Sequence, residues 1–106
     1  MIEETVPERL RDRLNEGESL FLLDVREPWE VDVCRLEGSV NIPMQQVPAR
    51  LAEIPRDRPI VCVCHHGMRS EQVARFLTLQ GLERVENLVG GIEEWANRVD
   101  PETPRY

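Results

Sequence analysis

Residues 61–81 read VCVCHHGMRSEQVARFLTLQG and join an apolar run to a helical pattern. The run PIVCVC, which ends at Cys64, is typical of a buried parallel strand. Residues 70–81 carry apolar residues at helical spacing, namely Val73, Ala74 and Leu77. The segment between must turn sharply, and Gly67 supplies the backbone freedom for that turn. The sequence therefore predicts a strand, a loop and a helix, with Cys64 at the carboxyl end of the strand.

Strand-like and helix-like segments alternate along the rest of the chain. Further strands are expected at residues 19–26, 38–43 and 84–88. Further helices are expected at residues 5–17, 27–33, 45–54 and 89–99. Such alternation predicts an α/β domain with a mainly parallel sheet, in which ligands collect at the carboxyl ends of the strands. Cys64 lies at such an end.

Capping residues and prolines mark where several of these helices begin. Thr5 and Glu8 fit a capping box for the helix at residues 5–17. Pro28 falls in the first turn of the second helix, and Pro48 opens or interrupts the third.

Composition limits the classes of function. With 106 residues, the chain is expected to form one domain around one hydrophobic core. Its apolar runs are far shorter than the roughly 20 residues of a membrane span, and its start is not a signal peptide, so we expect a cytoplasmic protein. The net charge of −7 argues against nucleic acid and anionic membranes as partners.

The three cysteines have different surroundings in the sequence. An odd number of cysteines in a cytoplasmic chain favours free thiols over a disulfide framework. Cys62 lies between two valines in the middle of a strand, and it is interpreted, like Cys34, as a buried structural residue. Cys64 differs because a glycine, an arginine and a helix start follow it.

The loop after Cys64 has the features of an anion-binding nucleophile site. Main-chain N–H groups of a tight turn, the start of the following helix and the guanidinium of Arg69 all favour a thiolate. The same groups would hold an anionic substrate or leaving group. His65 and His66 are expected to line this pocket and not to act as a base, since a thiolate already formed needs none.

A metal site at Cys62, Cys64, His65 and His66 is the alternative interpretation. Adjacent histidines point in different directions, whereas structural zinc sites use spaced pairs of ligands. A thioredoxin-type site would need C-x-x-C, and this chain has C-x-C. We therefore expect neither a metal ion nor a cofactor.

Five ordered motifs resemble those of single-domain rhodaneses, from about Val6 to Tyr106. They are LLDVREPWE (22–30), EGSVNIP (37–43), VCHHGMRS (63–70), NLVGGIEEW (87–95) and DPETPRY (100–106). The resemblance implies a rhodanese-like α/β fold, with a central, mainly parallel five-stranded sheet that has helices on both faces. It also implies one rhodanese domain over residues 1–106 and sulfurtransferase chemistry through a cysteine persulfide.

The resemblance also assigns roles to single residues. Cys64 matches the nucleophile that carries the sulfur. The loop that wraps the persulfide is matched by His65, His66, Gly67, Met68 and Arg69, followed by Ser70. Asp24 and Arg26 match a D-x-R pair that is expected to brace this loop, and Gly90, Gly91 and Trp95 match a packing motif. The chain departs from the family where Cys34 and Arg35 replace a Gly-His pair, which concerns a contact at a helix end.

The spacing C-x4-R between Cys64 and Arg69 favours sulfur transfer. Phosphatase relatives of this fold carry C-x5-R, and the longer loop has room for a tetrahedral phosphate or arsenate. A phosphatase or arsenate reductase and a non-catalytic interaction module are the alternatives. The expected partners are a small sulfur-containing anion or a persulfide as donor, and a sulfur-acceptor protein. The sequence does not choose between thiosulfate and larger persulfides.

Overall fold

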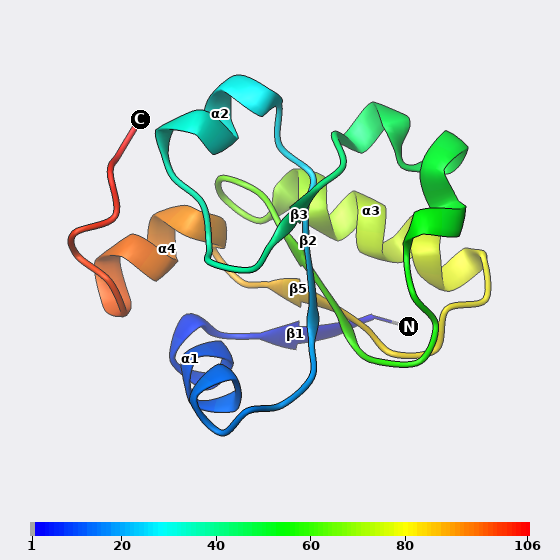
Figure 1. The fold of residues 1–106 in the computed structure, drawn as a ribbon, viewed down its shortest axis with the longest axis horizontal. Helices are drawn as coiled ribbons and strands as arrows, with labels where there is room; N and C mark the ends of the chain where they lie inside the picture. Colours follow the sequence, from blue (N-terminus) through cyan, green and yellow to red (C-terminus); the bar gives the residue numbers. More distant parts are fainter. Residues whose placement is uncertain (1) are drawn as a thin grey trace.

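A computed structural model describes residues 2–106 (Figure 1). The strands are β1 (Glu3–Thr5), β2 (Phe21–Asp24), β3 (Val40–Asn41), β4 (Ile60–Val63) and β5 (Val85–Leu88). The helices are α1 (Pro7–Asn15), α2 (Pro28–Val33), α3 (Met68–Leu79) and α4 (Gly91–Arg98), with two 3-10 helices, η1 (Met44–Gln46) and η2 (Pro48–Glu53). Within the described part of the chain, no helix combines the length and the apolar character that a bilayer-spanning segment needs.

All five strands run parallel in one sheet of order β1-β5-β4-β2-β3. The strand that precedes Cys64 is therefore central, with β2 and β5 as its neighbours. Each parallel pair needs a crossover, and the helices that supply the crossovers cover the sheet. The predicted parallel five-stranded sheet is confirmed.

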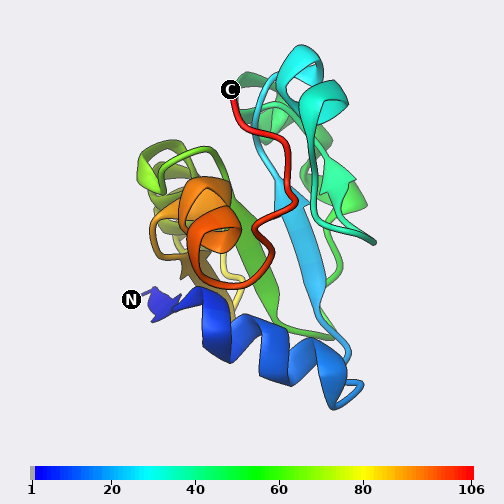
Figure 2. The ribbon, with the colours of Figure 1, turned by 90° about the vertical axis from the view of Figure 1, so that its left-hand side faces the viewer.

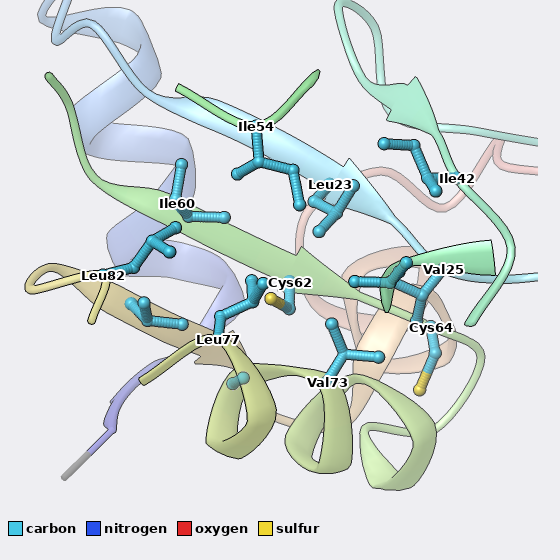
Figure 3. Packing of buried hydrophobic residues seen from close by; sticks show 13 residues of the cluster. Leu23, Val25, Ile42, Ile54, Ile60, Cys62, Cys64, Val73, Leu77 and Leu82 are labelled. Atoms are coloured by element: carbon cyan, nitrogen blue, oxygen red, sulfur yellow. The ribbon is translucent and has the colours of Figure 1, made fainter. Parts of the chain in front are cut away.

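Alternate residues of β4 divide the core into two clusters. Ile60 and Cys62 pack with residues of α3 and the 3-10 segment on one face (Figure 3). Val61 and Val63 pack with Leu10 of α1 and with residues of α4 on the other face. Helices thus cover both faces, as predicted, and this continuous burial explains why β4 is apolar throughout.

The beginning of the chain differs from the prediction. Residues 3–5 form β1, which pairs with β5 at one edge of the sheet, so Thr5 is a strand residue and not a helix cap. The helix begins one residue later than a Thr5 cap requires, with Val6 as an N-cap that makes no side-chain hydrogen bond and Pro7 in the first turn. Pairing with β5 satisfies the backbone of this segment and outweighs the local capping signal.

The segment after β3 also differs from the prediction. One helix over residues 45–54 was expected, and the chain instead forms η1 and η2 on either side of Val47. Pro48 has no N–H to continue an α-helix, and Arg50 interrupts η2 with non-helical backbone angles. Pro28 does begin α2, as predicted.

Candidate active site

Cys64 lies at the carboxyl edge of the sheet, where three central strands end (Figure 3). It follows β4 directly, and its sulfur lies beside the first turn of α3. Only 1% of the residue is exposed, and it belongs to the apolar cluster that contains Val25 and Val73. Cys64 is therefore enclosed by this cluster and by the loop that follows it.

Two groups make hydrogen bonds with the Cys64 sulfur. The amide of Gly67 donates to Sγ at 3.1 Å, and Oγ of Ser70 lies 3.2 Å from Sγ. Gly67 is the N-cap of α3 and has φ +101°, a conformation that favours glycine. These bonds support an anion on the sulfur. The wider set of loop amides expected around it stays a prediction.

Asn87 of β5 bonds the loop at two positions. Its Nδ2 donates to the carbonyl oxygen of Gly67 at 3.1 Å, and its Oδ1 accepts from Oγ of Ser70 at 2.5 Å. The single hydroxyl proton of Ser70 therefore has two acceptors within reach, namely Asn87 and the Cys64 sulfur. This arrangement lets Ser70 donate to the sulfur when the sulfur is ionised.

The first turn of α4 binds the backbone of the loop. The amide of Ile92 donates to the carbonyl oxygen of Cys64 at 2.9 Å, and the amide of Glu93 donates to that of His65 at 3.1 Å. These amides are among the donors that a helix N-terminus leaves without intrahelical partners. The helical turn that follows the Gly-Gly motif therefore holds the backbone of Cys64 and His65.

Arg69 does not extend freely toward the sulfur. Its Nη1 and Nη2 form a bidentate ion pair with the carboxylate of Glu30, at 2.7 and 2.9 Å. This pairing with Arg69, together with an amide and the Tyr106 hydroxyl, lowers the pKa of Glu30 to about 2. The positive charge expected near the sulfur is thus compensated by a carboxylate from α2. The role of Arg69 in binding an anion stays a prediction.

Asp24 and Arg26 form a buried pair beside the loop without touching it. Arg26 donates to both carboxylate oxygens of Asp24, at 2.7 Å for the shortest bond. It also donates to the carbonyl oxygen of Cys34 at 2.7 Å and to the hydroxyl of Tyr106 at 2.9 Å. The pair therefore secures the end of α2 and the C-terminal segment, and the bracing of the Cys64 loop that was expected of it stays a prediction.

An aromatic stack continues from the loop to the C-terminal segment. The rings of His66 and His65 are stacked with centroids 4.0 Å apart, and Tyr106 stacks on His65 at the same distance. Trp29 meets Tyr106 edge to face and is itself exposed. Figure 2 shows the C-terminal segment running from α4 toward α2. Burial, with a smaller effect of His66, lowers the pKa of His65, so this ring is neutral near pH 7.

One group of described residues has the composition of a metal site. His65, His66 and Glu93 each place a ligand atom within 4.8 Å of the others. The two imidazoles were expected to point in different directions, and they are instead stacked at an interplanar angle of 20°. Their lone pairs lie in two separate, nearly parallel planes and do not converge on one ion. Glu93 is also paired with Arg105 at 3.2 Å. This geometry does not fit a tetrahedral metal centre.

The other two cysteines lie outside the loop. Burial raises the pKa of the Cys62 thiol, which agrees with its interpretation as a core residue. Cys34 is buried at the end of α2, and its sulfur lies 4.0 Å from Nη1 of Arg26. The helix-end contact that the sequence left in doubt is made here by the guanidinium of Arg26.

Three residues of the site were not assigned a role from the sequence: Glu30, Asn87 and Tyr106. Each lies inside a motif that carries the family resemblance, which is the one signal that points to them. Their long-range contacts join residues that are between 17 and 80 positions apart, and no local pattern predicts such partners.

The rhodanese-like domain family matches residues 6–98. The chain belongs to this family. A sulfurtransferase from Allochromatium vinosum is 41% identical over 96 residues, which cover 91% of this chain and 90% of the relative. A rhodanese-related protein from Thermoplasma volcanium has a similar structure, with a TM-score of 0.84 and 28% identity over 92% of this chain and 93% of that one.

Longer proteins contain a similar domain. The NAD-dependent persulfide reductase from A. fulgidus matches with a TM-score of 0.71 and 36% identity. The match covers 89% of this rhodanese-like chain and 16% of the reductase. The sulfurtransferase relative, by contrast, matches over nearly its whole length.

Proposed function

We propose that this rhodanese-like chain, acting as one domain over residues 1–106, transfers a sulfane sulfur through a persulfide on Cys64. The donor is thiosulfate or a persulfide, and the acceptor is cyanide, a small thiol or the thiol of a protein. The observation that carries the proposal is the position of the Cys64 sulfur at the start of α3. The sulfur accepts a hydrogen bond from the amide of Gly67 and lies beside the hydroxyl of Ser70. The sulfurtransferase relative supports this reaction class.

The reaction has two half-reactions. In the first, the Cys64 thiolate attacks the outer sulfur of the donor, the sulfur–sulfur bond of the donor breaks, and sulfite or a thiolate leaves. In the second, the acceptor attacks the outer sulfur of the Cys64 persulfide and the thiolate is restored. A covalent intermediate between two substrates predicts ping-pong kinetics. The likeness to the persulfide reductase supports the choice of persulfide chemistry.

The residues around Cys64 have distinct roles in this proposal. The loop from His65 to Ser70 encloses the transferred sulfur, and its amides and hydroxyl hold negative charge on it. Asp24 and Arg26 maintain the neighbouring segment. The cytoplasmic location expected from the sequence stays a prediction, and the three free cysteines support it.

Two alternatives are less well supported by the site. A phosphatase or arsenate reductase needs an arginine that grips two oxygens of its substrate, and here Nη1 and Nη2 of Arg69 both donate to the Glu30 carboxylate. A non-catalytic interaction module has no use for a cysteine held by an amide and a hydroxyl.

Intact-mass measurement after incubation with thiosulfate, and separately with cysteine persulfide, tests the proposal. We expect the wild-type protein to gain about 32 Da, the mass of one sulfur atom, and to lose it on addition of cyanide. Cys64→Ser is expected to gain nothing, while the control Cys34→Ser loads normally. An unchanged mass with both donors, or loading that persists in Cys64→Ser, would contradict the proposal.

A further inference from the structure

The charge beside the Cys64 loop is organised around Glu30. Its Oε1 accepts from Arg69 at 2.7 Å and from the amide of Glu27 at 2.9 Å. Its Oε2 accepts from Arg69 and from the hydroxyl of Tyr106, both at 2.9 Å. Only 5% of the Glu30 side chain is exposed, against 35% for Arg69. The carboxylate is therefore a fixed part of the structure, and the arginine is held to it.

Other arginines near the loop are compensated in the same way. Arg26 is fully buried and paired with Asp24. Arg105 is paired with Glu93, whose carboxylate lies 3.5 Å from Nε2 of His65. Arg26, Arg69 and Arg105 are thus each paired with a carboxylate, and they have little charge left for an arriving anion.

The two classes of donor place very different charges on this site. Thiosulfate is a dianion, so its attack by a thiolate gathers three negative charges, and sulfite leaves with two of them. A hydropersulfide, R–S–SH, is neutral at the reacting sulfurs, and its attack gathers one negative charge. The second reaction needs no cation beyond the amide and hydroxyl already beside the sulfur.

We propose that Glu30 is a specificity-determining residue that, by holding Arg69 in an ion pair, favours hydropersulfide donors over thiosulfate at Cys64. The inference rests on the proposed function and names its substrate class. In the favoured step the Cys64 thiolate attacks the outer sulfur of R–S–SH. The sulfur–sulfur bond of the donor breaks, R–S⁻ leaves with the bonding pair, and the proton stays on the transferred sulfur as Cys64–S–SH.

Rapid-quench mass spectrometry gives the rate constant of Cys64 loading from each donor at pH 7. Glu30→Gln keeps the shape of the side chain and releases the charge of Arg69, so loading from thiosulfate is expected to rise about tenfold, while loading from cysteine persulfide changes less than threefold. Arg69→Met leaves the Glu30 carboxylate unpaired and lowers loading from thiosulfate by about the same factor. The double variant returns the ratio of the two rate constants to near the wild-type value.

A matched control is present on η2. Glu53 accepts two hydrogen bonds from Arg50, at 2.8 and 2.9 Å, in an exposed ion pair. Glu53→Gln makes the same change of net charge, and we expect it to leave the ratio unchanged. Should Glu30→Gln be too unstable to purify, the fall expected for Arg69→Met carries the test.

The outcomes separate this inference from the proposed function. The role of Glu30 is overturned if Glu30→Gln and Arg69→Met leave the ratio of the two loading rate constants unaltered while Cys64 still loads. It is also overturned if Glu53→Gln shifts this ratio equally. Failure of the wild-type protein to load from either donor contradicts the proposed function itself.

Discussion

Gly91 lies so close to Cys64 that no side chain fits between them. A Cβ atom on Gly91 would be 2.5 Å from the carbonyl oxygen of Cys64 and 2.4 Å from that of His65. The backbone at Gly91 also has φ +62°, which disfavours other residues. The close contact lets the first turn of α4 bind the carbonyl oxygens of both Cys64 and His65.

Gly91→Ala is therefore expected to displace the loop and to destabilise the protein. Gly17→Ala is the control, because Gly17 also has positive φ but a Cβ there would meet nothing within 4 Å. The control is expected to lower the free energy of unfolding by about 1–2 kcal/mol, which is the penalty for a left-handed backbone. Gly91→Ala is expected to lower it clearly more. Urea unfolding measures both, and sulfur loading is expected to fall only in Gly91→Ala. Equal losses of stability would show that the loop can move away at no cost.

Ser70→Ala removes a hydrogen-bond donor from the Cys64 sulfur. A hydrogen bond contributes about 1 kcal/mol, so alkylation of Cys64 by iodoacetamide at pH 7 is expected to slow about fivefold. Ser39→Ala is the control, since that hydroxyl donates to the carbonyl oxygen of Leu36 in a distant turn. Peptide mass mapping identifies the alkylated cysteine. A rate that does not change in Ser70→Ala would mean that the hydroxyl proton stays on Asn87.

The stability of the protein is expected to fall at low pH through Glu30. Its pKa is about 2 in the folded state, against a usual value of 4.5, so the folded protein favours the ionised form. The stabilisation is fully present above about pH 4.5 and is lost as the pH falls toward 2, and it amounts to about 3 kcal/mol.

Urea unfolding at pH 7 and pH 3 measures this contribution. The difference in unfolding free energy between wild type and Glu30→Gln is expected to narrow as the pH falls. Glu53→Gln, whose carboxylate is exposed, serves as the control and is expected to show a smaller change. A difference that stays constant between the two pH values would contradict the assignment.

Arg13 connects α1 to the sheet away from the site. It pairs with Glu86 of β5 at 2.6 Å, and both side chains are nearly buried. Arg13→Ala leaves the Glu86 carboxylate buried without its partner, which is expected to cost about 3–5 kcal/mol. Arg11→Ala, on the exposed side of the same helix, is expected to change stability by less than about 0.5 kcal/mol. Thermal unfolding measures the stability of both variants. A similar loss of stability in the two would mean that water replaces Arg13 as the partner of Glu86.

The loop after Cys64 could be predicted because its parts are contiguous in the sequence. The apolar run before Cys64, the turn at Gly67 and the helical spacing after Ser70 together give a strand, a loop and a helix. From α1 onward, the order of the strands and α-helices followed from the same local patterns, apart from the segment that forms η1 and η2. The conformation of such a short segment depends mainly on its own residues and little on the position of the rest of the chain.

The features that could not be predicted depend on distant partners. The segment Glu3–Thr5 is a short edge strand with two exposed glutamates, so it lacks the apolar alternation of a strand, and it exists because β5 pairs with it. Likewise, Arg69 has no neighbour in the sequence that reveals its partner, because Glu30 reaches it from another helix. A charged side chain in a motif indicates that the residue has a role, but it does not indicate which residue or ligand pairs with the charge.

Two amides that hold the loop after Cys64 belong to α4, the last of the described helices. During synthesis Cys64 therefore leaves the ribosome before the helix that binds its carbonyl oxygen. Until that helix docks, the carbonyl groups of Cys64 and His65 lack these two donors. The surroundings of Cys64 thus take their final form only late in the synthesis of the domain.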